Sequence, residues 1–296
     1  MVVEAVQAPR VVNGIPRFGD VDNYSESFGF QWNRFAATQL HPHSSERLWR
    51  ETGWTAAALD GLDILEVGSG AGRFSRVILE ETRANLYSVD YSTAVDANLR
   101  NNGTIAPDRF HLYQASIYDM PFADGSFDKV LCLGVLQHTP DFEASVRALV
   151  RKTRPGGEIV VDFYAIRGFW TKLNAKYLLR PFTRQMSQER LLALIDRNAN
   201  RLIAMSRFLQ RSELGVLRRF LPVVDIFNAL PPGLSDAELR EWVVLDTFDM
   251  FSPAYDNPQR VEAVAAMFER SGATIKFAGY VDVGTGKAAV IRAIKD

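Results

Sequence analysis

Cysteine is nearly absent from this chain of 296 residues, whose one cysteine, Cys132, lies in the apolar run KVLCLGVL. A chain with one cysteine cannot form an internal disulfide, and this usage favours a reducing compartment. Because its neighbours are apolar, we expect Cys132 to pack in a hydrophobic core rather than to react.

Long hydrophobic runs and an excess of charge are also lacking. No apolar stretch approaches the roughly 20 residues that span a bilayer, and the first twenty residues lack the basic start and apolar core of a secretory leader. The formal net charge is −1, so overall electrostatics favour no class of partner. We therefore expect a cytoplasmic protein without a membrane span.

What the sequence does contain is an alternation of apolar strands and amphipathic helices. Such strands indicate a parallel sheet that is covered on both faces. The pattern predicts an α/β fold, a doubly wound, mostly parallel, seven-stranded Rossmann-like sheet. The predicted strands are 62–69, 85–92, 110–117, 127–136, 157–165, 274–283 and 287–296.

The same pattern divides the chain into three parts. Residues 1–54 are expected to be a loose arm followed by an aromatic helical lid with a turn at Pro42. Residues 55–165 and 258–296 form the predicted sheet domain. Residues 166–257, punctuated by prolines, are predicted to be a helical insertion between strands 5 and 6 that caps the acceptor.

The stretch ILEVGSGAGRFS, residues 64–75, ends a predicted strand in three glycines. Glycine costs backbone entropy, so three in five residues indicate that a ligand approaches the backbone closely, at a helix N-terminus. Arg73 stands where the dinucleotide fingerprint G-x-G-x-x-G requires its third glycine. Glu66 would repel a pyrophosphate but suits a ligand with an ammonium group. These residues favour S-adenosylmethionine over NAD.

Asp90 ends the second predicted strand, in YSVDYS. A carboxylate there can accept both ribose hydroxyls of an adenosine. The alternative is a helix N-cap for the following segment, a position that aspartate favours.

Four segments resemble, in order, the motifs of the class I S-adenosylmethionine-dependent methyltransferases: ILEVGSGAGRFS, VDYS, DMPFADGSFDKVLCLGVLQHTPD and RPGGEIVVDFY. They are most similar to the small-molecule group whose fourth strand follows the phrase L-P-F-x-D-x-S-F-D. The resemblance covers about residues 62 to 164.

The resemblance implies a role for each matching residue. Asp90 would hold the ribose, and Tyr91 would pack on the adenine. Ser116 stands where the family often has an acidic residue, which leaves the backbone N–H of Ile117 for the adenine. The others would cradle the methionine part or close the pocket: Glu66, Gly68, Ser69, Gly70, Gly72, Leu133 and Gly134.

Methyl transfer from a sulfonium is an in-line displacement, and a hydroxyl acceptor usually needs a base. His138, just past the fourth predicted strand, is the candidate base; the alternative is a histidine that only caps a helix or packs beside the cofactor. The aromatic segment FGFQWNRF could cover the cofactor, with Arg34 facing the methionine carboxylate, or could simply pack on the sheet. Candidate acceptor contacts are Trp32, Tyr164, Asp246, Asp249 and Tyr255.

No metal is expected. Asp124 and Asp128 lie in DGSFD, which is typical of a turn, and His41 and His43 flank a proline without a third ligand. Between residues 167 and 219 the insertion is rich in arginine and lysine, which suits a solvated face, an anionic small-molecule acceptor or an anionic membrane surface. Its basic residues lack the aromatic interleaving of a single-strand-binding surface, so no nucleic acid is expected.

We therefore predict a methyltransferase that uses S-adenosylmethionine to methylate an oxygen, or less favourably a nitrogen, of a small molecule such as a sugar, a glycan precursor or a secondary metabolite. The rival hypotheses are a nicotinamide-dependent oxidoreductase and an inactive S-adenosylmethionine-binding scaffold. The sequence leaves the oligomeric state open, a homo-oligomer included.

Overall fold

The computed structural model describes residues 8–19, 23–38, 43–168, 171, 173–212, 215–284 and 286–296. His41 and the turn expected at Pro42 lie outside these residues. The chain divides into two compact units. The first comprises Met1–Ala165, Tyr255–Val283 and Lys287–Asp296, and the second comprises Ile166–Ala254 and Gly284–Gly286.

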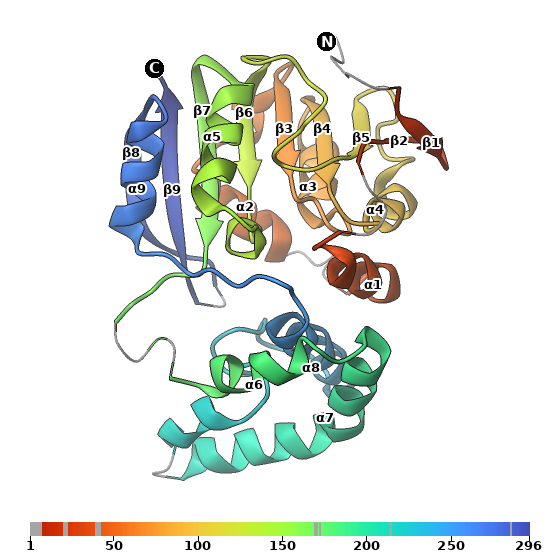
Figure 1. Ribbon diagram of the computed structural model, residues 1–296, viewed down its shortest axis with the longest axis vertical. Coiled ribbons are helices and arrows are strands. Elements are labelled where there is room, and N and C mark those ends of the chain that lie inside the picture. Colours follow the sequence, from red (N-terminus) through yellow and green to blue (C-terminus); the bar gives the residue numbers. More distant parts are fainter. Residues whose placement is uncertain are drawn as a thin grey trace. The chain divides into compact units, whose positions relative to one another are not determined.

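The first unit is built on one sheet with strand order β1-β2-β5-β4-β3-β6-β7-β9-β8 (Figure 1). The five central strands, from β5 to β7, are parallel, and β9 is antiparallel to both of its neighbours. This confirms the predicted doubly wound α/β sheet. The strands are β1 (Arg10–Val12), β2 (Ile15–Arg17), β3 (Asp63–Val67), β4 (Asn85–Asp90), β5 (Phe110–Gln114), β6 (Phe127–Cys132), β7 (Thr153–Phe163), β8 (Ala273–Asp282) and β9 (Lys287–Lys295).

The predicted number of seven strands was wrong, because the described residues form nine. The two additional strands, β1 and β2, form a hairpin where the sequence indicated a loose arm. Its turn is Asn13-Gly14, with φ of 54° and 79°. Both values are positive, as the tight turns that suit hairpins require, and Asn-Gly is the pair that adopts them most readily.

Helices cover both faces of the sheet. Successive residues of β3 enter different cores: Leu65 packs with α5 and α9, whereas Ile64 packs with α2, α3 and α4. Cys132 is fully buried in the first of these cores. The helices of this unit are α1 (Glu26–Arg34), α2 (His43–Thr52), α3 (Arg73–Glu81), α4 (Val95–Asn102), α5 (Phe142–Lys152) and α9 (Val261–Arg270).

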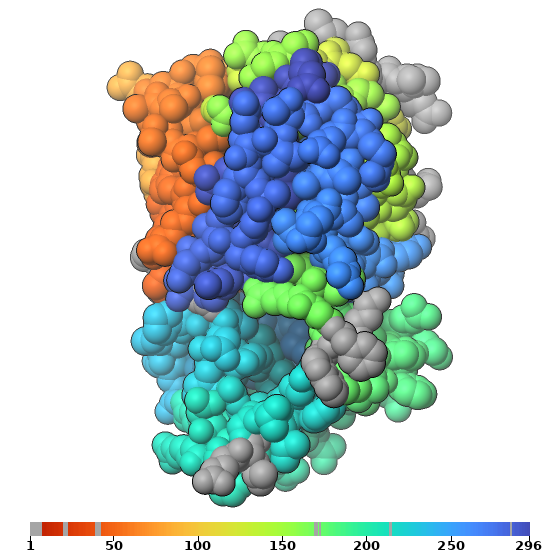
Figure 2. Space-filling model, turned by 90° about the vertical axis from the view of Figure 1, so that its left-hand side faces the viewer, coloured from red at the N-terminus to blue at the C-terminus, as the bar shows by residue number. Residues whose placement is uncertain are grey.

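The last strand, β9, forms hydrogen bonds with the C-terminal end of α2. Arg292 on β9 donates to the backbone carbonyls of Glu51 at 2.9 Å and Arg50 at 2.6 Å. Figure 2 shows this side of the unit, where the blue C-terminal segment lies beside orange residues from the first part of the chain.

The second unit is helical. It contains α6 (Ala175–Thr183), α7 (Gln188–Arg211), the 3₁₀ helix η4 (Gly215–Phe220) and α8 (Asp236–Phe251). Its core includes Ile203 of α7 and Trp242 and Val243 of α8. Ser235 caps α8 in a capping box with Glu238. None of the described helices has the length and hydrophobicity needed to cross a membrane.

Candidate cofactor site at the carboxyl ends of β3 and β4

The glycine loop joins β3 to α3 at the carboxyl edge of the sheet, where open α/β sheets bind ligands. Gly68, Gly70 and Gly72 all have positive φ, of 78°, 53° and 84°. A Cβ on Gly68 would lie 2.2 Å from Cγ2 of Val135. The loop therefore requires glycine for its backbone conformation and for its close packing.

Asparagines of α4 hold this loop in place. Asn98 donates to Oγ of Ser69 at 3.1 Å, and Asn102 donates to the carbonyl of Gly72 at 2.9 Å. A Cβ on Gly72 would lie 2.1 Å from Oδ1 of Asn98 and 2.2 Å from Nδ2 of Asn102. These asparagines were not predicted from sequence, although DANLRNNG, which begins six residues after Asp90, contains three asparagines in all.

Glu66 lies on β3, 2% exposed, directly before the loop. Its Oε2 accepts hydrogen bonds from Oγ of Ser75 and Oγ of Ser88, both at 2.5 Å. Its Oε1 is buried and has no hydrogen-bond partner among the described residues. Burial raises the pKa of Glu66 to about 7, and the two serine hydroxyls act against this shift.

Asp90 lies at the end of β4 and faces the glycine loop. Its Oδ2 accepts from the backbone N–H of Gly70 at 2.8 Å. Its Oδ1 accepts from the N–H and the Oγ of Ser92, at 2.8 and 2.6 Å. Burial raises the pKa of Asp90, and these bonds lower it. Asp90 does not cap α4, because Ala94 occupies the N-cap position. Its carboxylate instead joins the two strand ends.

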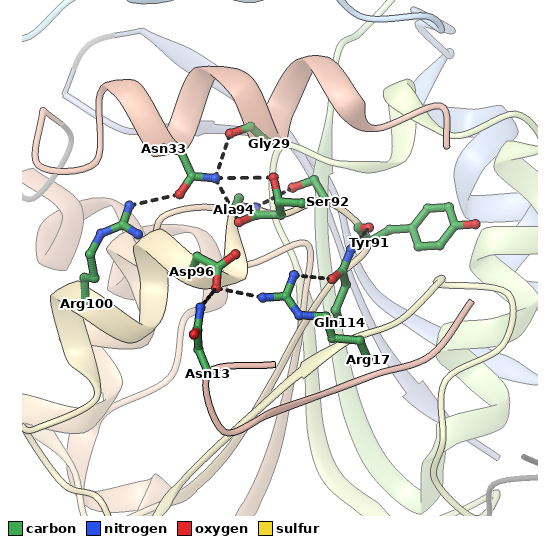
Figure 3. A network of polar contacts seen from close by, with 11 residues as sticks. Asn13, Arg17, Gly29, Asn33, Tyr91, Ser92, Ala94, Asp96, Arg100 and Gln114 are labelled. Atoms are coloured by element: carbon green, nitrogen blue, oxygen red, sulfur yellow. Dashed lines mark hydrogen bonds and ion pairs between the residues drawn. The ribbon is translucent and has the colours of Figure 1, made fainter. Parts of the chain in front are cut away.

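A second group of contacts anchors the loop that follows β4 (Figure 3). Arg17 of β2 forms an ion pair with Asp96 at 2.7 Å and donates to Oε1 of Gln114 at 2.7 Å. Gln114 in turn donates to the carbonyl of Tyr91 at 3.0 Å. Asn33 of α1 donates to the carbonyl of Thr93 at 2.9 Å. The hairpin, through Arg17, and α1, through Asn33, thus hold in place the loop between β4 and α4.

Aromatic rings gather beside Asp90. The ring of Tyr24 lies 5.4 Å from that of Tyr91 and 5.7 Å from that of Tyr255. Burial raises the pKa of Tyr24, and the nearby Tyr118, Tyr91 and Asp90 add to this shift. Tyr91 and Tyr255 were predicted as site residues from sequence, whereas Tyr24 was not. Its position just before the aromatic segment 28–35 was the available signal.

His138 ends the short 3₁₀ helix η2 (Leu136–His138) and is buried. Its Nδ1 lies 3.0 Å from the carbonyl oxygen of Tyr255. Its ring lies 5.0 Å from Phe28 and 5.5 Å from Tyr164, which is 38% exposed. Because a carbonyl oxygen only accepts, Nδ1 carries the proton in this contact. In the neutral ring the acceptor is then Nε2.

Two ion pairs between the partly buried Arg47 and buried carboxylates lie near the loop that follows β6. Asp162 of β7 accepts from the backbone N–H of Gly134 and pairs with Arg47 at 2.7 Å. Arg47 also pairs with the fully buried Glu51 at 2.9 Å. Burial raises the pKa of Glu51 and Arg47 lowers it. This pairing, which the sequence analysis missed, fixes the start of the segment that carries His138.

The other residues predicted from sequence to bind the cofactor or the acceptor lie in both units. The indole Nε1 of Trp32 would lie 3.2 Å from a Cβ on Gly70, so Trp32 stands at the glycine loop. Arg34 is exposed on the last turn of α1. Ile117 and Leu133 are buried, and Oγ of Ser116 accepts from the N–H of Tyr118 at 3.3 Å. Asp246 and Asp249 are half-buried on α8 of the second unit.

The residues considered for metal binding have other partners. Asp124 pairs with Lys152 at 2.9 Å, and Asp128 pairs with Arg154 at 2.8 Å. Among the residues that the structure describes, no group of three or more metal-ligating side chains occurs.

Comparisons with known proteins agree with this fold. The family described as "Methyltransferase domain" matches residues 65–161. An arsenite methyltransferase of Aquipseudomonas alcaligenes is 30% identical over 159 residues, which cover 50% of this chain and 46% of that protein. An uncharacterised protein of Synechococcus is 27% identical over 227 residues, covering 74% of this chain and 48% of that protein.

Among solved structures, magnesium protoporphyrin IX methyltransferase of Synechocystis with bound S-adenosylhomocysteine superposes with a TM-score of 0.51. It is 13% identical in sequence and covers 92% of this chain and 97% of its own. At that identity the likeness concerns the fold. Residues 65–161 thus match a methyltransferase domain, in the segment where the motifs indicated one. The chain spans about half the length of the relatives with which its sequence aligns.

Proposed function

We propose that this protein transfers the methyl group of S-adenosylmethionine to an oxygen atom of a small molecule. The observation that carries the proposal is the buried, unbonded Oε1 of Glu66, directly before a loop of three glycines with positive φ. A buried carboxylate oxygen needs a donor, and an ammonium group supplies one. The residues present therefore fit the amino-acid part of S-adenosylmethionine.

The other strand end fits the adenosine part. Asp90 is already held by the N–H of Gly70, and carboxylate oxygens can accept more than one hydrogen bond each. We assign it the ribose hydroxyls. Tyr91 and Tyr24 supply aromatic faces beside it, and Ile117 supplies a buried apolar contact for the adenine. Trp32 at Gly70 would cover the methionine part.

When bound, S-adenosylmethionine supplies a methyl group on a sulfonium, which leaves as a neutral thioether. The protein has to hold the acceptor in line, exclude water and accept the proton of a hydroxyl acceptor. We assign the proton to Nε2 of His138, because the carbonyl of Tyr255 orients the ring through Nδ1. Phe28 and Tyr164 flank this imidazole and exclude water from it.

We assign acceptor binding to Tyr164 and Tyr255 of the first unit, because both contact the aromatic residues around His138 or Tyr24. The role of Asp246 and Asp249 of α8 as polar acceptor contacts, and of residues 166–257 as a cap, stays a prediction. A sugar, a glycan precursor or a secondary metabolite with an anionic group suits the arginine-rich composition of this segment.

The test is methyl transfer by the purified chain from labelled S-adenosylmethionine to panels of sugars, phenols and amines. A labelled O-methyl product supports the proposal, and a labelled N-methyl product would contradict the assignment to oxygen. His138→Ala is expected to lower kcat about a hundredfold, the usual contribution of a general base, with S-adenosylhomocysteine affinity changed less than twofold. Equal losses of kcat and affinity would instead show that His138 serves the cofactor site.

A further inference from the structure

Exposed apolar side chains are concentrated in the second unit. Of the fifteen large hydrophobic residues most exposed in the described chain, eleven lie in this unit, although it holds less than a third of the residues. Scattered exposed apolar residues are normal on protein surfaces, but such a concentration marks a surface that meets a partner.

Part of this surface is a ridge of exposed side chains on α7. Leu194, Met205 and Phe208 are 50%, 49% and 70% exposed. At 100° per residue they lie roughly 105° to 170° around the helix from the centre of the buried face, which is formed by Leu191, Leu192, Ile195, Ala199, Ile203 and Ser206. A helix that only separated a core from water would carry polar side chains at these positions.

Three arginines occupy the same ridge. Arg190, Arg197 and Arg201 are exposed, lie along the same side of the helix as the apolar side chains, and have no ion-pair partner among the described residues. Arg207, off the ridge, is paired with Asp236 at 3.0 Å. The two acidic residues of α7, Glu189 and Asp196, lie to one side of the ridge. From Arg190 to Phe208 the ridge is about 27 Å long.

We propose that this ridge docks the protein on an anionic lipid surface. Unpaired arginines are attracted by anionic headgroups, and their apolar stems can lie along the interface. The leucine, methionine and phenylalanine side chains of the ridge lower the free energy only when they leave water. A lipid surface allows this burial, whereas the phosphate backbone of a nucleic acid does not. Because its six exposed side chains are spread over about 27 Å of helix, the ridge suits an extended surface. This inference is independent of the proposed methyl transfer.

Sedimentation with vesicles tests the proposal. The full chain is expected to sediment with vesicles of phosphatidylcholine and phosphatidylglycerol at about 70:30 mole percent, and not with vesicles of phosphatidylcholine alone. Salt at about 0.5 M should release the chain from the mixed vesicles. The double variant Arg197→Gln/Arg201→Gln should weaken binding about thirtyfold, because each arginine near such a surface contributes about a factor of five. Phe208→Ser should weaken it several-fold.

The matched control is Arg83→Gln/Arg147→Gln. It removes the same charge from two exposed arginines of the first unit that have no ion-pair partner among the described residues. This control should bind vesicles as the wild type does, and all variants should keep the wild-type circular dichroism because the changed side chains are exposed. Equal weakening by both pairs, equal binding to phosphatidylcholine alone, or no sedimentation would overturn the proposal. So would self-association that Phe208→Ser abolishes, or binding of RNA without binding of vesicles.

Discussion

The glycine loop of the first unit and the ridge of α7 in the second place their charged groups in opposite surroundings. Glu66 and Asp90 are buried, and hydrogen bonds from neighbouring serines and from the loop backbone hold them. Arg197 and Arg201 are exposed and unpaired among the described residues. Fixed, buried polar groups suit a small ligand of defined shape, whereas exposed, mobile charges suit an extended surface. The two surfaces should therefore respond to different changes.

Gly72→Ala should distinguish the glycine loop from the ridge most strongly, because it should weaken cofactor binding and leave vesicle binding unchanged. A Cβ at Gly72 would lie within about 2.2 Å of both Asn98 and Asn102, so both buried side chains would have to move and lose hydrogen bonds. Asn98 donates to Ser69 and Ser75, and Asn102 donates to the carbonyl of Gly72. At about 1 kcal/mol for each of these three bonds, the affinity for S-adenosylhomocysteine should fall at least about a hundredfold by isothermal titration calorimetry, with vesicle binding unchanged.

Gly61→Ala is the matched control for this change. Gly61 also has positive φ, 75°, but nothing lies within 4 Å of a Cβ there. It should cost about 1 kcal/mol of stability and leave the affinity unchanged. A loss of affinity at Gly61 equal to that at Gly72 would mean that the close packing of the loop is irrelevant.

Asp90→Asn should have the next largest effect. Each of the two carboxylate oxygens accepts from a backbone N–H, of Gly70 or of Ser92. An asparagine has only one oxygen, so its amide would face one of these donors whichever way it turns. One unsatisfied buried donor costs about 1–3 kcal/mol. We expect a ten- to hundredfold loss of cofactor affinity. An unchanged affinity, measured by the same calorimetry, would refute the ribose assignment.

Much of the first unit could be predicted from sequence, because its signals are local. The apolar runs at β3, β4 and β6 predicted these strands, and the glycines between β3 and α3 predicted the loop. The β1–β2 hairpin was missed since its strands have three residues each, too few for a periodic pattern. Asn13-Gly14 carried the only local signal for it.

The supporting contacts of the site were not predictable in the same way. Arg17 and Asp96 pair across 79 positions of sequence, and Arg47 and Asp162 across 115. Neither residue type nor spacing identifies such a partner; only the folded sheet brings them together. Tyr24 was missed for the same reason, because its contacts with Tyr91 and Tyr255 are long-range.

Glu66→Gln should remove the pH dependence of cofactor binding at the glycine loop. With its pKa near 7, Glu66 is largely protonated below pH 7 in the free protein, whereas a cationic ligand favours the carboxylate. Affinity for S-adenosylhomocysteine should therefore rise up to about tenfold per pH unit between pH 5.5 and 7 (approximate limits) and then level off. Glu66→Gln should abolish this dependence and bind weakly throughout.

The stability of the free protein should also depend on pH through the carboxyl group of Glu66. The folded pKa lies above the ordinary 4.5, so stability from the protonated Glu66 is fully present below pH 4.5 and is lost as the pH rises through about 7. At pH 8, Glu66→Gln should therefore melt at a higher temperature than the wild type in thermal unfolding. A lower melting temperature would contradict an unpaired buried charge.

Phe208→Ser should have the smallest effect on the cofactor site. Its side chain is 70% exposed on the second unit, so S-adenosylhomocysteine affinity should stay within twofold of the wild type. A large loss of affinity in the same titration would show that the ridge and the glycine loop are not separate surfaces.

Calorimetric titration of the wild-type chain with S-adenosylmethionine and, separately, with NAD addresses the glycine loop directly. Binding of one S-adenosylmethionine per chain, at least about a hundredfold tighter than NAD and weakened about ten- to hundredfold in Asp90→Asn, is the expected result. Absence of S-adenosylmethionine binding, or tighter binding of NAD, would contradict the assignment of Glu66, Asp90 and the loop between them.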